Sequence, residues 1–371
     1  MISSRVGAPL IEARNITKHY DGFTLQGVSL TVESGQIVGF IGQNGAGKST
    51  TIKALLGIIG IDAGDARILG VDARGLSGAD AAVKERIGVV FDTVSMPPHI
   101  KIAEVGKLMD RAYQTWDARV FEEYLHRFKL DSKKAIKELS RGMGMKLSLA
   151  CALAHNPQVL ILDEATAGLD PMARDEVLDM LREFVAVEDA AGNPQHAILM
   201  SSHITSDLDK IADTVVCIDD GRIVFACDKD EICDLMGVAR CRAAEVEQVL
   251  TSAQAPMEVR VLHHDYGVDL LVPDRFEFMR AFPQIPCDRV SIDDYMALVL
   301  KGRSCIRVTA SRKAVMRDDA HVQDGARGVW AIPQAAGVQH PVHGGVFHGG
   351  HGQHFHVAGH HFHDGDVQPV K

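Results

Sequence analysis

Residues Gly42–Ser49 read Gly-Gln-Asn-Gly-Ala-Gly-Lys-Ser, and of all segments of the chain this octapeptide indicates a chemical role most directly. Its spacing of glycine, lysine and serine is typical of a loop that binds nucleotide phosphates. The glycines let the backbone form a concave nest of N–H donors, Lys48 would reach the outer phosphates, and the Ser49 hydroxyl would bind Mg²⁺. The alternative is a glycine-rich turn without a ligand. We predict triphosphate contacts from Gly42, Gln43, Asn44, Gly45, Ala46, Gly47, Lys48, Ser49 and Thr50.

Two carboxylates follow a second apolar run. Val159–Leu162 is typical of a buried strand, and Asp163 and Glu164 come directly after it. A carboxylate at the end of a strand beside a phosphate loop suits Mg²⁺, so Asp163 is the predicted ligand. Glu164 would orient or deprotonate an attacking water.

Three further segments carry polar groups at places where elements begin or end. Leu139–Met143 precedes a predicted helix, with Ser140 as a good N-cap; a simple capped helix is the alternative. Gly168–Asp170 follows the two carboxylates. His203 ends the next predicted strand, where it would reach a γ-phosphate, although a lone histidine is often structural.

Alternating strands and helices must position these groups. Apolar strands are expected at Ile37–Ile41 and Ala197–Met200, and a hairpin turn at Asp21-Gly22. Apolar residues at three- and four-residue spacing predict helices between about residues 93 and 155. The pattern predicts a mainly parallel α/β core with an inserted helical subdomain.

Composition limits the class of protein. A chain of 371 residues allows about two or three structural units. The net charge of −10 argues against non-specific nucleic-acid binding, so no nucleic-acid partner is expected. We expect no secretory signal, no membrane span of about 18 apolar residues and seven reduced, mostly buried cysteines.

The C-terminal part differs in character. Residues 229–310 have a globular composition that could form a small α+β appendage. From residue 311 the periodicity disappears, and nine of the 18 histidines lie between His340 and His363, which predicts a disordered tail. Its histidines suit Zn²⁺, Ni²⁺ or Cu²⁺; incidental metal affinity of a low-complexity extension is the alternative.

In this order of motifs, residues 8–228 resemble the ATP-binding cassette (ABC) ATPases along their whole length. Gly42–Ser49 matches the Walker A loop, Val159–Asp163 the Walker B strand and Glu164 the catalytic glutamate. His203 matches the switch histidine. The remaining correspondences are the signature at Ser140, Arg141, Gly142 and Met143, the D-loop with Asp170, and Tyr20 as the aromatic residue that stacks on adenine, or else an ordinary strand aromatic.

The resemblance implies a P-loop NTPase core of the RecA-like type with an N-terminal antiparallel β subdomain. The implied domains are an ATPase domain at 1–228 with a helical subdomain at about 93–155, an accessory domain at 229–310 and the tail at 311–371. ATP and Mg²⁺ are the implied cofactors, with Lys48, Glu164 and His203 in catalysis. The implied partners are a second ABC subunit, identical or related, and a membrane permease on separate chains, which would hold the protein at the cytoplasmic face of the membrane.

Four residues depart from the family pattern. Asp92 stands where a glutamine is expected and would meet Mg²⁺, and the signature has Arg141 and Met143 in place of glycine and glutamine. Ala165 replaces a proline. Asp92 and Met143 are similar to one branch of bacterial ABC ATPases that serve antibiotic-resistance or multidrug exporters. The alternatives are a non-transport ABC ATPase and a nucleotide-gated regulatory module; since Lys48, Asp163, Glu164 and His203 are retained, we expect hydrolysis.

Overall fold

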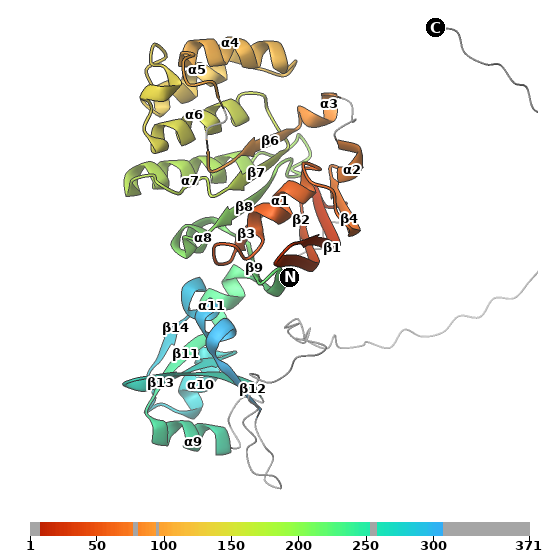
Figure 1. Cartoon of the computed structure of the whole chain (residues 1–371). Helices are drawn as coiled ribbons and strands as arrows, with labels where there is room; N and C mark the ends of the chain where they lie inside the picture. The colour runs from red at the N-terminus through yellow and green to blue at the C-terminus, as the bar shows by residue number, and fades with distance from the viewer. Residues whose placement is uncertain (1–7, 77–80, 94–95, 253–257, 307–371) are drawn as a thin grey trace, which may run out of the picture. The chain divides into compact units, whose positions relative to one another are not determined.

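The computed structural model describes residues 8–76, 81–93, 96–252 and 258–306. Within these ranges the strands form three sheets of six, four and five strands, with helices packed against them (Figure 1). The predicted tail at 311–371, with the histidines suggested there as metal ligands, lies outside the described residues.

The six-stranded sheet carries the ends of the strands that bear the predicted site. Its order is β10-β9-β3-β8-β7-β6, parallel throughout except for the hairpin of β9 and β10. Its central strands are buried on both faces, which explains their unbroken apolar runs. The strands are β3 (Ile37–Ile41), β6 (Ile87–Val90), β7 (Val159–Asp163), β8 (Ala197–Ser202), β9 (Thr214–Asp219) and β10 (Arg222–Asp228).

A four-stranded antiparallel sheet with the order β2-β1-β4-β5 lies against this core. The predicted turn is confirmed, because β1 and β2 are joined by Asp21-Gly22, with Gly22 at φ 82°. Leu25, Phe40 and Ile52 are fully buried in one apolar core that joins both sheets to helix α1 (Lys48–Leu55). The strands are β1 (Ile11–Tyr20), β2 (Phe23–Val32), β4 (Ala63–Ile68) and β5 (Val71–Asp72).

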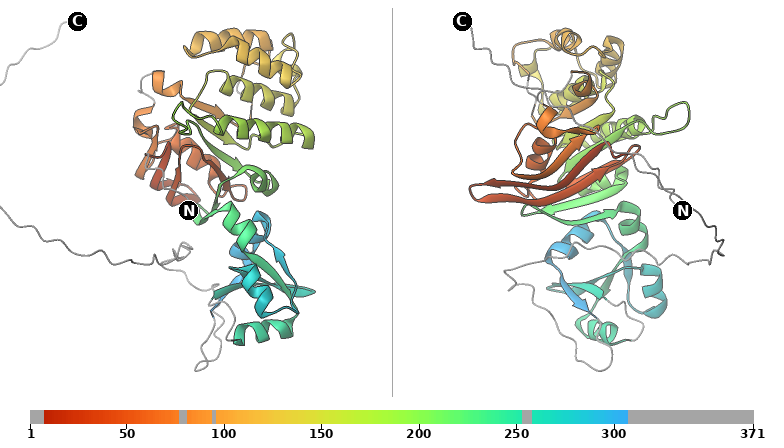
Figure 2. Two further views of the ribbon diagram at one scale, coloured as in Figure 1. Left: turned by 180° about the vertical axis from the view of Figure 1, so that it is seen from behind. Right: turned by 90° about the vertical axis from the view of Figure 1, so that its right-hand side faces the viewer.

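The predicted helical insertion is present. Helices α4, α5 and α6 contact one another in a helical layer, and α6 also packs on β6 (Figure 2 shows the layer from two sides). The bounds here are α2 (Ala73–Leu76), α3 (Ala81–Lys84), α4 (Ile102–Ala112), α5 (Ala118–Arg127), the 3-10 turn η1 (Ile136–Glu138) and α6 (Arg141–Leu153).

Two helices follow β7 and β8, namely α7 (Pro171–Val185) and α8 (Thr205–Ile211). Apolar spacing in the sequence predicts a helix at Glu176–Val187. The helix is present, but it begins at Pro171, so the predicted start is wrong by five residues. Asp170 caps the helix by accepting from Ala173 N at 3.0 Å, and Pro171 occupies the first turn. Proline there loses no hydrogen bond, so cap and proline fix the start.

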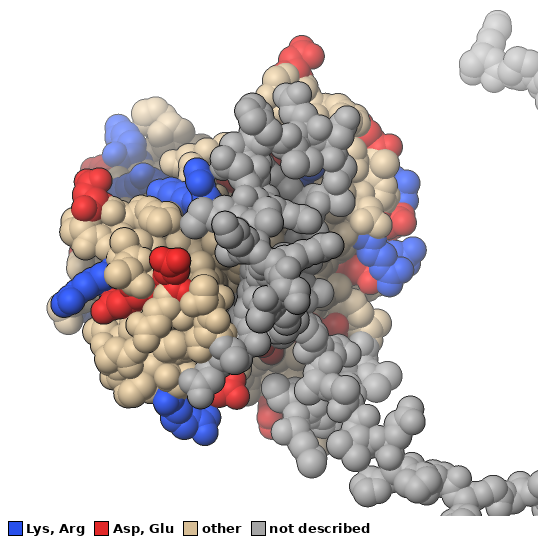
Figure 3. Space-filling view, turned by 90° about the horizontal axis from the view of Figure 1, so that it is seen from below, with Lys and Arg blue, Asp and Glu red and all other residues tan. Residues whose placement is uncertain are grey.

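The expected C-terminal α+β fold is confirmed as far as residue 306. An antiparallel sheet with the order β14-β11-β13-β12-β15 packs one face on α9 and α10 through a separate apolar core. Acidic and basic side chains are interspersed on the uncovered part of the face in Figure 3. The elements are η2 (Glu231–Leu235), β11 (Gly237–Cys241), α9 (Ala243–Thr251), β12 (Glu258–His264), β13 (Gly267–Val272), α10 (Arg275–Ala281), β14 (Cys287–Arg289), α11 (Ile292–Lys301) and β15 (Arg303–Ile306).

The cysteines are free thiols, as expected. Six are buried and Cys287 is half-buried. Burial raises the pKa of the Cys151 and Cys217 thiols to about 12, so they stay protonated at neutral pH. Among the described residues, no helix combines the length and apolar character that a membrane crossing needs.

Candidate nucleotide site

The phosphate loop lies between β3 and α1, and close packing explains its glycines. A Cβ on Gly42 would lie 2.3 Å from the Ile218 carbonyl oxygen, and Gly47 has φ 118°, a conformation that disfavours side chains. Gly45, at φ 84°, faces open space instead, so its glycine is needed for conformation and not for room. The loop backbone therefore reaches its bend only with glycine at these positions.

The buried side chain of Lys48 ties the two ends of this loop together. Its side chain is only 6% exposed, and Nζ donates to the carbonyl oxygens of Gly42 at 2.8 Å and Gln43 at 3.3 Å. Gln43 and Ser49 are exposed beside it. The ammonium is thus held under the loop with exposed polar groups around it, an arrangement that suits a polyanion.

Asp163 and Glu164 turn in different directions at the end of β7. Asp163 stays in the sheet, 4% exposed, and its Oδ1 accepts from Ser201 Oγ at 2.6 Å. The same Ser201 hydroxyl oxygen accepts from Glu164 N at 3.2 Å. Glu164 has φ 57°, which is unfavourable for a residue with a side chain and marks a locally constrained backbone.

This turn brings Glu164 between Lys48 and His203. Its Oε1 lies 3.4 Å from Lys48 Nζ, and its Oε2 lies 2.5 Å from His203 Nδ1 and accepts from His203 N at 3.3 Å. Apart from the ion pair, the buried Oε1 has no hydrogen-bond donor among the described residues. Three segments far apart in sequence thus place a carboxylate, an ammonium and an imidazole together where parallel strands end. Such a group can bind a phosphate and accept a proton from water.

The segment predicted to be the signature begins α6. Ser140 caps the helix by accepting from Met143 N at 3.2 Å, and Ser140 and Arg141 are exposed. The segment also touches the D-loop of its own chain, since a Cβ on Gly142 would lie 3.3 Å from the Gly168 carbonyl oxygen. Seen from the other side, a Cβ on Gly168 would lie 3.1 Å from Arg141 Cδ. The predicted signature and the predicted D-loop therefore pack directly on each other.

Two predicted residues lie apart from the Lys48–Glu164–His203 group. Tyr20 ends β1 with 45% of its surface exposed, and Lys18 Nζ lies over its ring, 5.7 Å from the centroid, so the stacking of Tyr20 on adenine stays a prediction. Asp92 is exposed and lines a hollow of about 450 Å³ together with Ser140 and Arg141. The part of Asp92 in metal binding stays a prediction.

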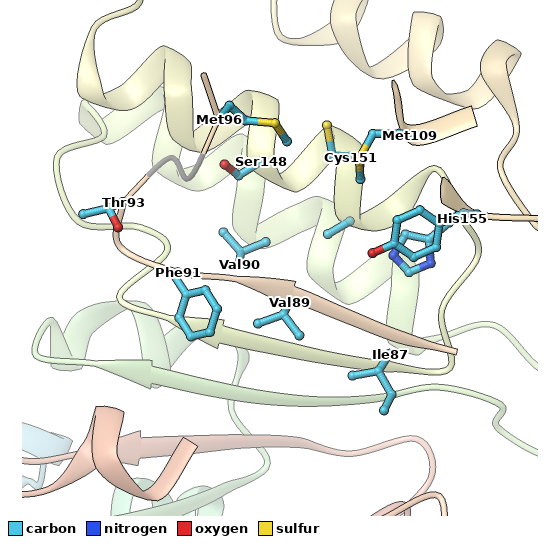
Figure 4. Close-up of a pocket in the computed structure, with 12 residues that line it drawn as sticks. Ile87, Val89, Val90, Phe91, Thr93, Met96, Met109, Ser148, Cys151 and His155 are labelled. Atoms are coloured by element: carbon cyan, nitrogen blue, oxygen red, sulfur yellow. The ribbon is translucent and has the colours of Figure 1, made fainter. Parts of the chain in front are cut away.

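A second hollow, of about 160 Å³, lies between β6 and α6 and is drawn in Figure 4. Met109 and Cys151 give it a largely apolar lining. His155 stacks on Tyr113, with ring centroids 4.3 Å apart, and its Nδ1 donates to the Glu85 carbonyl oxygen at 2.8 Å. Burial lowers the pKa of His155, so the ring is neutral at pH 7 and serves packing of the helical layer on the sheet.

Sequence reasoning missed Ser201, which links Asp163 to the backbone of Glu164. A serine at the end of an apolar strand, two residues before His203, is the signal that could have indicated it. It also missed Thr166, Arg174 and Asp207, which lie behind the site.

Comparison with known proteins supports one family. The family model described as ABC transporter matches residues 25–167. The ABC transporter ATP-binding protein YtrB of Bacillus subtilis is 30% identical over 226 residues, covering 60% of this chain and 73% of the relative. Nod factor export ATP-binding protein I of Sinorhizobium fredii is 34% identical (68% of this chain, 73% of the relative). The daunorubicin/doxorubicin resistance ATP-binding protein DrrA of Streptomyces peucetius is 30% identical, covering 74% of this chain and 84% of the relative.

Solved structures agree on the fold. The structure of an ATP-binding subunit of an ABC transporter superposes with a TM-score of 0.53 at 27% identity, over 60% of this chain and 91% of that one. A dimeric ATP-binding cassette bound to ADP and Pi gives a TM-score of 0.51 at 20% identity, over 59% of this chain and 98% of that one. This likeness supports the fold alone. With relatives that match over more than two thirds of their length, the chain belongs to the ABC transporter family, as an ATP-binding subunit that hydrolyses ATP.

Proposed function

We propose that this chain supplies ATP hydrolysis to an exporter whose membrane permease is formed by separate chains. The contact of Glu164 with both Lys48 and His203 carries the catalytic part of the proposal. The names of two relatives, one for Nod factor export and one for daunorubicin/doxorubicin resistance, support export as the direction of transport.

The residues divide the work by their chemistry. The triphosphate of ATP replaces Glu164 as the main anion opposite Lys48, because the phosphates carry more charge than one carboxylate. Glu164 is then available to orient a water and accept its proton, and His203 approaches the γ-phosphate from β8. The loop N–H groups from Gly42 to Thr50 bind the phosphates, and Tyr20 stacks on the adenine.

Oxygen donors at the site fit Mg²⁺. Asp163 is buried, with Oδ1 held by Ser201, and the exposed Ser49 hydroxyl lies in the first turn of α1. Both are hard oxygen ligands of the kind that Mg²⁺ prefers; Asp92 is a further candidate. A bound Mg²⁺ would neutralise charge on the β- and γ-phosphates.

Removal of divalent cations should therefore abolish hydrolysis while leaving measurable ATP binding. We expect turnover with excess EDTA to fall at least about 10²-fold, because charge on the phosphates is no longer neutralised. Phosphate release and ATP titration with EDTA, then with MgCl₂ added back, measure both effects. Full turnover in EDTA would contradict the assignment of Ser49 and Asp163 as metal ligands.

The second half of each site would come from another subunit. Ser140, Arg141, Gly142 and Met143 lie at the start of α6, where Ser140 and Arg141 are exposed and accessible to a partner. We propose a head-to-tail dimer, of identical or related subunits, in which this segment contacts the ATP held by the other subunit. Dimer closure on ATP would then move the permease.

Co-purification tests the transporter assignment. The full chain, expressed with the membrane proteins encoded beside its gene, should sediment with membranes and elute with a permease in mild detergent. The same chain expressed alone is the control and should not sediment with membranes. If the co-expressed chain stays in the supernatant and elutes with ribosomes or DNA, it belongs to the non-transport ABC ATPases.

A further inference from the structure

A buried polar cluster behind the site connects three segments that the mechanism uses. Asp207 of α8 is 1% exposed and Thr166, two residues after Glu164, is fully buried. Arg174 of α7 contributes a guanidinium whose Nε is buried. A carboxylate rarely lies so deep in a protein without a specific reason.

Arg174 connects the D-loop to α8. Its Nε lies 3.8 Å from Asp207 Oδ1, and its Nη2 donates to the Leu169 carbonyl oxygen at 3.4 Å. One planar guanidinium thus contacts the D-loop backbone on one side and the helix after His203 on the other.

The cluster is incompletely satisfied. Burial raises the pKa of the Asp207 carboxyl, while Thr166 and Arg174 act in the opposite direction. Within the described ranges, Asp207 Oδ2, Thr166 Oγ1 and Arg174 Nε are buried with no hydrogen-bond partner of good geometry, although Thr166 and Arg174 both lie near the carboxylate. Buried polar and charged groups cost stability, so their presence behind the site favours a role in positioning the segments that they join.

The cluster is connected by direct contacts both to the segment that carries His203 and to the predicted signature. Helix α8 begins at Thr205, two residues after His203, and Asp207 N donates to the Ile204 carbonyl oxygen at 3.2 Å. On the other side, the D-loop glycine Gly168 packs against Arg141 of the signature. A displacement of the signature is therefore passed by direct contacts to the D-loop, then to Arg174, and then to the segment that carries His203.

We propose that Arg174 and Asp207 are positioning residues that hold the D-loop and the His203 segment together, so that closure on a partner's ATP sets the position of His203. This inference rests on the proposed dimeric mechanism. In this proposal neither residue contacts the nucleotide, so their loss should affect the rate of hydrolysis and not the binding of ATP.

The test compares purified full-length variants. Asp207→Asn keeps the shape of the side chain and removes its charge; we expect kcat to fall about tenfold with KM for ATP changed less than about twofold. Arg174→Met should lower kcat by a similar factor. Because the two residues act as a unit, the kcat of the double variant should lie within about twofold of the kcat of the slower single variant.

The matched control is Asp175→Asn. Asp175 of α7 pairs with Lys210 of α8 at 2.5 Å, so it joins the same two helices, but both side chains are about half exposed. Exposed pairs contribute little, and kcat should stay within about twofold of wild type. Equal kcat losses in Asp175→Asn and Asp207→Asn would mean that the cluster only stabilises the helix pair, which would overturn the proposal.

Two further measurements keep the result decisive. If Asp207→Asn does not fold, Arg174→Lys replaces it, since lysine keeps the charge near Asp207 but cannot contact Leu169 at the same time; wild-type kcat in Arg174→Lys would overturn the inference. ATP-dependent dimerisation of Glu164→Gln separates the two proposals. No dimer would refute the dimeric mechanism itself, whereas a dimer with wild-type kcat in Asp207→Asn would refute only the role of the cluster.

Discussion

Replacement of Glu164 by glutamine should lower ATP turnover by about 10²–10⁴-fold while ATP binding persists. Glutamine keeps the size of the side chain but cannot accept a proton from water at neutral pH. The Lys48 contacts with Gly42 and Gln43, which close the phosphate loop, do not depend on Glu164. Binding and hydrolysis should therefore separate in this variant.

A second effect should accompany the loss of turnover. If ATP closes a dimer and hydrolysis opens it, Glu164→Gln should accumulate as an ATP-bound dimer. Phosphate release under saturating ATP measures the first effect, and size-exclusion chromatography with light scattering, with and without ATP, measures the second. Glu188→Gln is a suitable control, because Glu188 is exposed in the segment between α7 and β8. Wild-type turnover in Glu164→Gln would remove Glu164 from its assigned role.

The parts of the fold that were predictable depend on local sequence. The phosphate loop, the buried strands before it and after Pro157, and the Asp21-Gly22 turn follow from glycine placement and apolar runs within about ten residues. The structure has β3, α1, β7 and the hairpin at these places. The start of α7 was missed because an apolar stripe does not mark the cap, although Asp170-Pro171 does.

The sequence indicates Lys48, Glu164 and His203 as candidate residues but not how their side chains meet. His203 and Glu164 are 39 positions apart, and their contact depends on the pairing of β7 with β8. The left-handed φ of Glu164 has no local signal, since glutamate rarely adopts it. Asp207 could not be recognised either, because its charge is typical of an exposed helix face and its burial depends on α7.

Replacement of Lys48 by alanine should weaken ATP binding by about 10²-fold, because a buried ammonium that faces a polyanion cannot be replaced by solvent. The loop should also loosen, since the bonds to the Gly42 and Gln43 carbonyl oxygens disappear. Glu164 would in addition lose its opposite charge, so turnover of any bound ATP should fall by about 10³-fold. Calorimetric titration with ATP and single-turnover phosphate release measure the two effects separately.

Two control variants make the Lys48 result specific. Lys53→Ala removes an exposed lysine from the same helix and should leave ATP affinity within about twofold of wild type. Lys48→Arg keeps the positive charge, but the larger planar guanidinium must fit a site where Lys48 is only 6% exposed, so it should not restore affinity. If Lys48→Ala binds and hydrolyses ATP as wild type does, the phosphates do not bind at this loop. If Lys48→Arg binds and hydrolyses ATP as wild type does, the positive charge alone accounts for the role of Lys48, and the close packing of its ammonium is not required. The expected ranking of ATP affinity is therefore wild type and Lys53→Ala first, with both Lys48 variants far below.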